Sequence, residues 1–191
     1  MNRRLIVLGF AALALLPLHG GRLAAQAVIF GEEAKLEPMR AGLKAEVIIL
    51  RDTLYAVNAT AARLVRAKIS TTPSVVLSAA RVLQRDCVRA TRSVVAMRKN
   101  MTVVGTNDPR GKVVISQYNT GLDELQRAMI SCDKVLVAEL AKPTGTDQDP
   151  LFRVALASTD AIQKYDWKLQ VLLKTLQIPL DPKGFRSAIN M

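Results

Sequence analysis

The sequence predicts an all-α protein, an antiparallel up-down four-helix bundle, and three observations lead to this prediction. Along four segments the apolar residues recur at alternating spacings of three and four, which is the pattern of an amphipathic helix and not of a strand. Short connections join the segments, and short connections favour antiparallel neighbours. The fourth segment keeps a seven-residue apolar repeat like that of a coiled coil, which indicates left-handed supercoiling.

Residues 1–27 have the features of a cleaved secretory signal peptide. Arg3 and Arg4 precede an apolar run of 14 residues, 5–18, and small residues follow it. About 20 apolar residues are needed to span a bilayer, so an uncleaved anchor fits this run less well. We therefore expect export to the periplasm or the extracellular space. The mature chain, residues 28–191, is expected to form one domain without a transmembrane segment.

The first predicted helix spans residues 33–69, and the second begins after Thr72. Thr72 is a candidate N-cap, and Pro73 suits the first helical position, where a backbone N–H has no partner within the helix. The apolar stripe of the second helix consists of Val76, Ala79, Leu83, Cys87, Ala90, Val94, Met97 and Met101.

The connection between the second and third helices, residues 102–117, is predicted to be a small β-hairpin or else a plain loop. Two valine-rich stretches flank a turn sequence in which Pro109 suits the first turn position and Gly111 the left-handed position. Because an isolated hairpin is marginally stable in water, we expect it to pack against the ends of the helices.

The third predicted helix begins at Thr120. Its hydroxyl would accept a hydrogen bond from the backbone N–H of Asp123, and the Asp123 carboxylate would accept one from the backbone N–H of Thr120. The fourth begins at Asp149 with Pro150 in its first turn, and a C-terminal tail follows from about residue 178. The apolar stripe of the fourth helix consists of Leu151, Ala155, Ser158, Ile162, Tyr165, Leu169, Leu172 and Leu176.

The two cysteines are predicted to form a disulfide. If the second and third helices are antiparallel and turn between residues 108 and 111, residues that face each other have numbers that sum to 219. Cys87 and Cys132 meet this condition, and both lie on apolar stripes. An oxidising compartment would then favour the disulfide. The alternative is a pair of buried reduced thiols, because bundle axes lie about 8–10 Å apart and a disulfide needs Cα atoms within about 7 Å.

Five basic residues of the second helix share one face, on the side away from its apolar stripe. At 100° per residue they fall within an arc of about 80° and extend over about 27 Å of helix. Residues 63–112 hold 11 basic and two acidic residues, whereas residues 113–191 hold nine of each. The residues of this basic face are Arg81, Arg85, Arg89, Arg92 and Lys99.

The basic face has two interpretations. Its charges could pair with acids of a neighbouring helix, such as Glu46, Asp160 or Asp166, or they could bind an anionic partner. Like charges four residues apart destabilise a helix, so one of these compensations is expected. The signal peptide holds three of the 27 basic residues and none of the 16 acidic ones, which leaves a net charge of +8. The acids of the second half are already balanced by its own bases, which favours a partner.

Catalysis and cofactor binding have little support in the sequence. His19 is the single histidine and lies in the signal peptide, so the mature chain lacks the usual general base and the commonest metal ligand. The numbers of Asp86 and Asp133 also sum to 219, so these two carboxylates are expected to face each other. Two carboxylates are too few to bind a hard cation, which takes six or more oxygen ligands. We therefore expect no enzyme activity, no cofactor and no metal site.

Two functional hypotheses follow. The first is an exported, non-enzymatic bundle whose basic face binds an anionic envelope polymer, a lipid headgroup or an acidic protein. Nucleic acid fits this face less well, because no aromatic residues interleave with the arginines. The second is a small-molecule sensor or carrier with a pocket between its helices. Its pocket would form at the small stripe residues Ala79, Ala90, Ala155 and Ser158.

Overall fold

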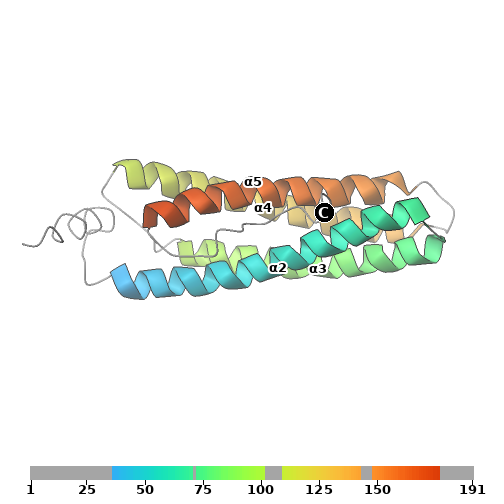
Figure 1. Ribbon diagram of the computed structural model, residues 1–191, viewed down its shortest axis with the longest axis horizontal. Coiled ribbons are helices and arrows are strands. Elements are labelled where there is room, and N and C mark those ends of the chain that lie inside the picture. Colours follow the sequence, from blue (N-terminus) through green and yellow to red (C-terminus); the bar gives the residue numbers. More distant parts are fainter. Residues whose placement is uncertain (1–35, 71, 102–108, 143–147, 177–191) are drawn as a thin grey trace, which may run out of the picture.

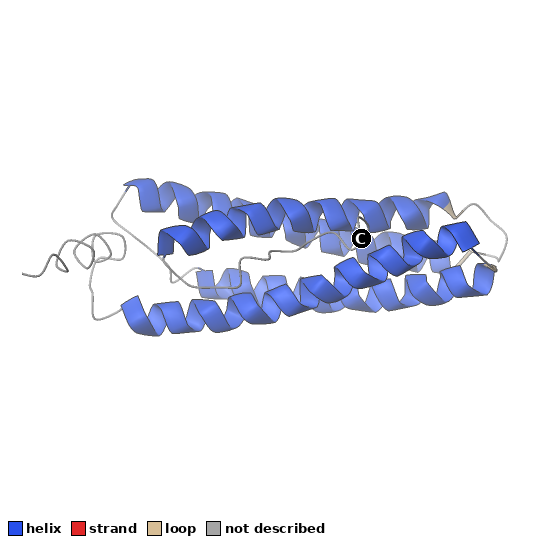
Figure 2. Cartoon of the chain, in the orientation of Figure 1, coloured by secondary structure: helices blue, strands red, loops and turns tan. Residues whose placement is uncertain are grey.

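The computed structural model describes residues 36–70, 72–101, 109–142 and 148–176, and these form four long helices packed side by side (Figure 1). Within them every regular element is a helix (Figure 2), so the predicted four-helix bundle is confirmed. The helices are α2 (Leu36–Ser70), α3 (Pro73–Met101), α4 (Pro109–Leu140) and α5 (Asp149–Leu176).

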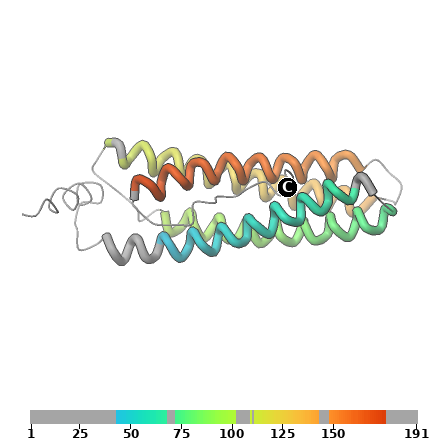
Figure 3. Tube along the Cα trace, in the orientation of Figure 1, coloured from blue at the N-terminus to red at the C-terminus, as the bar shows by residue number. Residues whose placement is uncertain are grey.

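Each helix runs antiparallel to the one before it, as the chain colouring of Figure 3 shows. α2 packs against α3, α3 against α4, α4 against α5, and α5 returns to pack against α2. This closed ring places α3 diagonally opposite α5. The two sides of α3 therefore meet α2 and α4, and the side turned away from the core faces solvent.

The buried side chains follow the stripes predicted from the apolar spacing. In α3 there are two differences from the prediction: Ala80 is buried while Ala79 is only partly buried, and the carboxylate residue Asp86 is buried as well. Burying one leucine or valine side chain is worth about 1.5–3 kcal/mol, so these stripes supply most of the driving force for folding. The buried residues of α3 are Val76, Ala80, Leu83, Asp86, Cys87, Ala90, Val94, Met97 and Met101.

The hairpin or plain loop predicted for residues 102–117 is wrong in its second half, because α4 already begins at Pro109. The other half, residues 102–108, lies outside the described residues. Ile115 and Tyr118 are buried three residues apart while Val113 is exposed, which continues the helical stripe of α4. The β-propensity of valine thus yields to packing on one helix face. Pro109 occupies the first helical position, where the missing N–H costs nothing.

Thr120 is not a helix cap. Its hydroxyl lies in the middle of α4 and donates a hydrogen bond to the carbonyl oxygen of Ser116 at 3.0 Å. Threonine side chains make such bonds to the preceding turn inside helices as readily as they cap a helix start. The capping interpretation failed because the true start of α4 lies eleven residues earlier, at Pro109.

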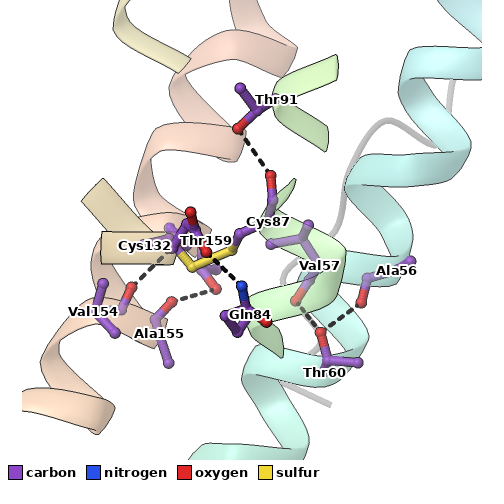
Figure 4. Close-up of a disulfide and its surroundings, with 12 residues drawn as sticks. Ala56, Val57, Thr60, Gln84, Cys87, Thr91, Cys132, Val154, Ala155 and Thr159 are labelled. Carbon is purple, nitrogen blue, oxygen red and sulfur yellow. Dashed lines mark hydrogen bonds between the residues drawn. A yellow bond between two sulfur atoms is a disulfide. The ribbon is translucent and has the colours of Figure 1, made fainter. Parts of the chain in front are cut away.

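The disulfide between Cys87 and Cys132 is present and joins α3 to α4 in the core (Figure 4). The two Cα atoms are 6.2 Å apart, which is within the reach of a disulfide, and both residues are fully buried. Nearby, the hydroxyls of Thr60 and Thr159 donate to carbonyl oxygens of their own helices. These two hydroxyls are therefore satisfied within their own helices.

A pair of buried tyrosines joins α4 to α5. The hydroxyls of Tyr118 and Tyr165 are 2.8 Å apart, and the ring centroids are 5.7 Å apart. Burial disfavours the charged phenolate, so the pKa of both residues lies well above the ordinary value of 10. The hydrogen bond between the hydroxyls allows two polar groups to be buried here at low cost.

Gly121 of α4 lies against the side chain of Lys168 of α5. A Cβ atom at this position would lie 2.7 Å from Cδ of Lys168, so the absence of a side chain makes room for the lysine. The Nζ atom of Lys168 reaches a carboxylate oxygen of Glu124 at 2.7 Å, and this hydrogen bond lowers the pKa of the Glu124 carboxyl. The pair is partly exposed, so it contributes modestly to stability.

Removing the disulfide should destabilise the bundle. In the chain-entropy model, a bond that closes a loop between residues 45 apart stabilises the folded state by about 4 kcal/mol. We expect the Cys87→Ala/Cys132→Ala variant to lose a large part of this free energy of unfolding in urea, measured by circular dichroism. Reduced wild-type protein is the control and should lose a similar amount. An unchanged urea midpoint in both would contradict the prediction.

The tyrosine pair should make the protein sensitive to high pH. Above pH 10 the unfolded tyrosines ionise while Tyr118 and Tyr165 stay protonated, so stability is full below pH 10 and falls as the pH rises through the raised pKa values. The slope is up to about 1.4 kcal/mol per pH unit for each tyrosine. Urea unfolding between pH 8 and 11.5 should show a shallower decline for Tyr118→Phe/Tyr165→Phe. Parallel curves for the two proteins would refute this effect.

Candidate anion-binding surface

All five residues predicted to form the basic face are exposed on α3, and Lys99 lies toward α4, where it lines a pocket with Asn119 and Asp123. The side chain of Arg89, for example, is 72% exposed. This placement follows from the buried stripe of α3, which holds the opposite side of the helix against the core. The helix thus directs a row of positive charges into solvent along most of its length.

Charge pairing within α3 itself is slight. Asp86 is buried and has one carboxylate oxygen 3.8 Å from Nη1 of Arg89. Among the described residues, Arg81, Arg85 and Arg92 have no ion-pair partner. The centre of the basic face therefore keeps most of its positive charge.

The acids considered as partners from neighbouring helices do not neutralise the basic face. Asp160 pairs with Lys164 on its own helix, 2.7 Å from Nζ. Both Asp160 and Asp166 belong to α5, which lies diagonally across the bundle from α3. Glu46 on α2 forms no ion pair with the described residues. The interpretation of a paired, solvated face loses support at these three positions.

Asp86 and Asp133, which flank the cysteines, have separate partners. Asp86 approaches Arg89, whereas Asp133 accepts a hydrogen bond from the side-chain amide of Gln84. In the part of the chain that the structure describes, no three potential ligand side chains converge on a metal site. Both carboxylates are used in contacts within α3 or between α3 and α4.

On the side of α3 that faces α4, a different arginine, Arg98, contacts the neighbouring helix. Nη2 of Arg98 lies 2.8 Å from a carboxylate oxygen of Asp123, and Nη1 donates to the side-chain oxygen of Gln126 at 2.6 Å. These contacts join α3 to α4 at the level of the last turn of α3. Arg98 is thus structural, which agrees with its absence from the predicted basic face.

The α2 side of α3 carries a feature that the sequence analysis missed. An open groove of about 640 Å³ runs between the two helices. Arg63 and Arg66 of α2 and Ser74 and Ser78 of α3 line it, together with small and apolar residues. We name it the α2/α3 groove. Arg63 and Arg66, three residues apart and shortly before the predicted end of the first helix at residue 69, were the signal that could have located it.

A second groove, between α4 and α5, shows the contrast in charge. It has a volume of about 380 Å³ and includes Trp167, which is 66% exposed. Its two lysines, Lys164 and Lys168, are paired with Asp160 and Glu124 at 2.7 Å each. Positive charge is therefore balanced on this side of the bundle and unbalanced on the side of α2 and α3.

Comparison of this chain with protein-family models, with curated proteins and with solved structures finds no match. None of the helices described is both long enough and apolar enough to cross a membrane. The most pronounced chemical feature of the described surface is the row of arginines on α3, in which Arg81, Arg85 and Arg92 have no ion-pair partner among the described residues.

Proposed function

We propose that this is an exported, non-enzymatic helical-bundle protein that binds an anionic envelope component or an acidic protein. The observation that carries the proposal is the outward face of α3, where three arginines have no ion-pair partner among the described residues. The binding residues would be Arg81, Arg85, Arg89, Arg92 and Lys99.

The electrostatic free energy of the basic face supports a partner. Arginines three and four residues apart on one helix repel each other by a few tenths of a kcal/mol per pair. A bound anion removes this repulsion, and each guanidinium can form two parallel hydrogen bonds to a phosphate or carboxylate. A single exposed ion pair is worth about 0–1 kcal/mol, so useful affinity requires several of them at once. A row of basic residues along one helix provides that number.

Export rests on two sequence features and one structural feature. The basic start and short apolar run of residues 1–27 have the pattern of a secretory signal peptide. The disulfide adds to this, because disulfides persist in the periplasm and outside the cell and are rare in the reducing cytosol. An exported protein with a basic surface would meet many anionic polymers and headgroups.

The alternative, a small-molecule sensor or carrier with a pocket between the helices, has less support at three of its four small positions. Ala90, Ala155 and Ser158 are fully buried among their neighbours, whereas Ala79 is partly buried and lines the α2/α3 groove. The hydroxyl of Ser158 donates to the carbonyl oxygen of Val154 at 2.8 Å. It is therefore already satisfied without a ligand.

Neutralising the basic face should abolish binding to anionic surfaces. We expect the variant Arg81→Gln/Arg85→Gln/Arg92→Gln to co-sediment at least tenfold less with vesicles that contain phosphatidylglycerol. Binding of the wild-type protein should fall steeply between about 50 and 300 mM salt, because the electrostatic screening length shortens over that range. The result must be compared with a variant of equal net charge.

The matched control neutralises three exposed basic residues elsewhere, as Arg127→Gln/Lys134→Gln/Arg153→Gln on α4 and α5. This control should retain most of the binding. Equal losses in the two triple variants would show that net charge, and not the basic face, determines the interaction. Full binding by the α3 variant to both vesicles and polyglutamate would overturn the proposed function.

A further inference from the structure

We infer that the α2/α3 groove is a binding site for a phosphate group carried on an apolar body, the chemistry of a phospholipid headgroup. The inference rests on the proposed function, because it assumes that this side of the bundle binds anions. It adds to the proposed function a second set of binding residues, separate from the basic face, and a chemical class of ligand. The site would be formed by Arg63 and Arg66 of α2 and by Ser74 and Ser78 of α3.

The polar half of the groove matches a phosphate. Arg63 and Arg66 lie three residues apart, so both guanidinium groups project from neighbouring positions on the same side of α2. Ser74 and Ser78 lie four residues apart and place two hydroxyls at the groove, and the Ser74 hydroxyl also lies 3.3 Å from the hydroxyl of Thr72. Arginine forks and hydroxyl groups together supply more donors than a carboxylate can accept, which favours the three or four oxygens of a phosphate.

The charge around the groove is uncompensated. No carboxylate lines it, and among the described residues neither Arg63 nor Arg66 takes part in an ion pair. Ser74 also lies in the first turn of α3, where the helix dipole is positive. An anion in the groove would thus meet favourable potential from two side chains and from the start of a helix.

The other half of the groove is apolar and remains in contact with water. Val75 is 47% exposed, and Val82, Ala67 and Ala79 complete this half. Bound inorganic phosphate would leave these side chains exposed to solvent, whereas a phosphate ester with an apolar group would cover them. Burial of apolar surface is favourable, so the groove should prefer the amphiphile over free phosphate.

The size of the groove selects a small ligand over a protein segment. Its residues on α2 lie between Thr60 and Ala67, about 10 Å along the helix at 1.5 Å per residue. Its volume of about 640 Å³ lies within the usual range for small-molecule sites, about 300–1,000 Å³. A docked acidic helix would extend over several turns beyond these limits.

The test is a titration of the full mature protein with dihexanoyl phosphatidic acid below its micelle concentration, followed by backbone amide NMR. We expect shifts at residues 60–67 and 74–82, and a dissociation constant at least tenfold higher for Arg63→Gln/Arg66→Gln. The variant Ser74→Ala/Ser78→Ala keeps the charge and should bind severalfold more weakly. The control Arg127→Gln/Arg153→Gln changes net charge equally and should bind like the wild type.

Three further probes separate the possible sources of the ligand. Inorganic phosphate should bind more weakly than the amphiphile, and equal affinity would overturn the requirement for an apolar body. Dihexanoyl phosphatidylcholine, which has the same chains but no net charge, should also bind more weakly. A hexaglutamate peptide that occupied the groove more tightly than phosphatidic acid would overturn the inference in favour of an acidic peptide.

The groove and the basic face can fail independently. If Arg63→Gln/Arg66→Gln binds phosphatidic acid as tightly as the wild type while the α3 triple variant loses vesicle binding, the groove inference is wrong and the proposed function remains. If the α3 triple variant keeps full vesicle binding while the groove variant loses phosphatidic acid, the basic face is not the binding surface. Equal weakening by the groove variant and its charge control would overturn the groove inference.

Discussion

The buried stripe of α3, linked covalently to α4 by the bond between Cys87 and Cys132, fixes how α3 is rotated about its own axis, and the rest of the surface depends on that rotation. Because successive residues are 100° apart on a helix, holding Cys87 against α4 directs the positions about 160° away toward solvent. Arg85 and Arg89 are at such positions. One covalent link with its Cα atoms 6.2 Å apart thus connects the packing of the core to the direction of the arginines.

Charge is distributed differently on the sides of the bundle. Between α3 and α4, Arg98 is neutralised by Asp123, and between α4 and α5, Lys168 is neutralised by Glu124. In each of these pairs an acid of one helix offsets a base of the neighbouring helix. On the side of α2 and α3, Arg63 and Arg66 line a groove without a carboxylate. Self-repulsion there is a cost to stability, and an anionic ligand is the simplest compensation.

The sequence was sufficient for the four helices and for the disulfide, because both depend on regular spacing. The residue-number rule for Cys87 and Cys132 held even though its assumed hairpin is partly helix, since facing residues of antiparallel helices keep a nearly constant sum along their contact. The pairs Gln84–Asp133 and Arg98–Asp123 have sums of 217 and 221, close to 219. The hairpin failed because valine spacing alone does not distinguish a strand from a helix flank. The α2/α3 groove was missed because a helical wheel describes one helix, whereas a groove needs two.

The groove and the basic face are continuous along α3, and this continuity bears on how strongly a surface of phosphates would be held. Ser74, Ser78, Arg81 and Arg85 follow one another at spacings of four, three and four, so they lie along one stripe of the helix. A headgroup bound in the groove would bring the arginine row within reach of neighbouring headgroups. Each further contact is then intramolecular, so individually weak ion pairs add to a useful affinity without additional translational cost. Arrangement along one helix, and not the strength of any single pair, is therefore the property that would make this basic surface a binding surface.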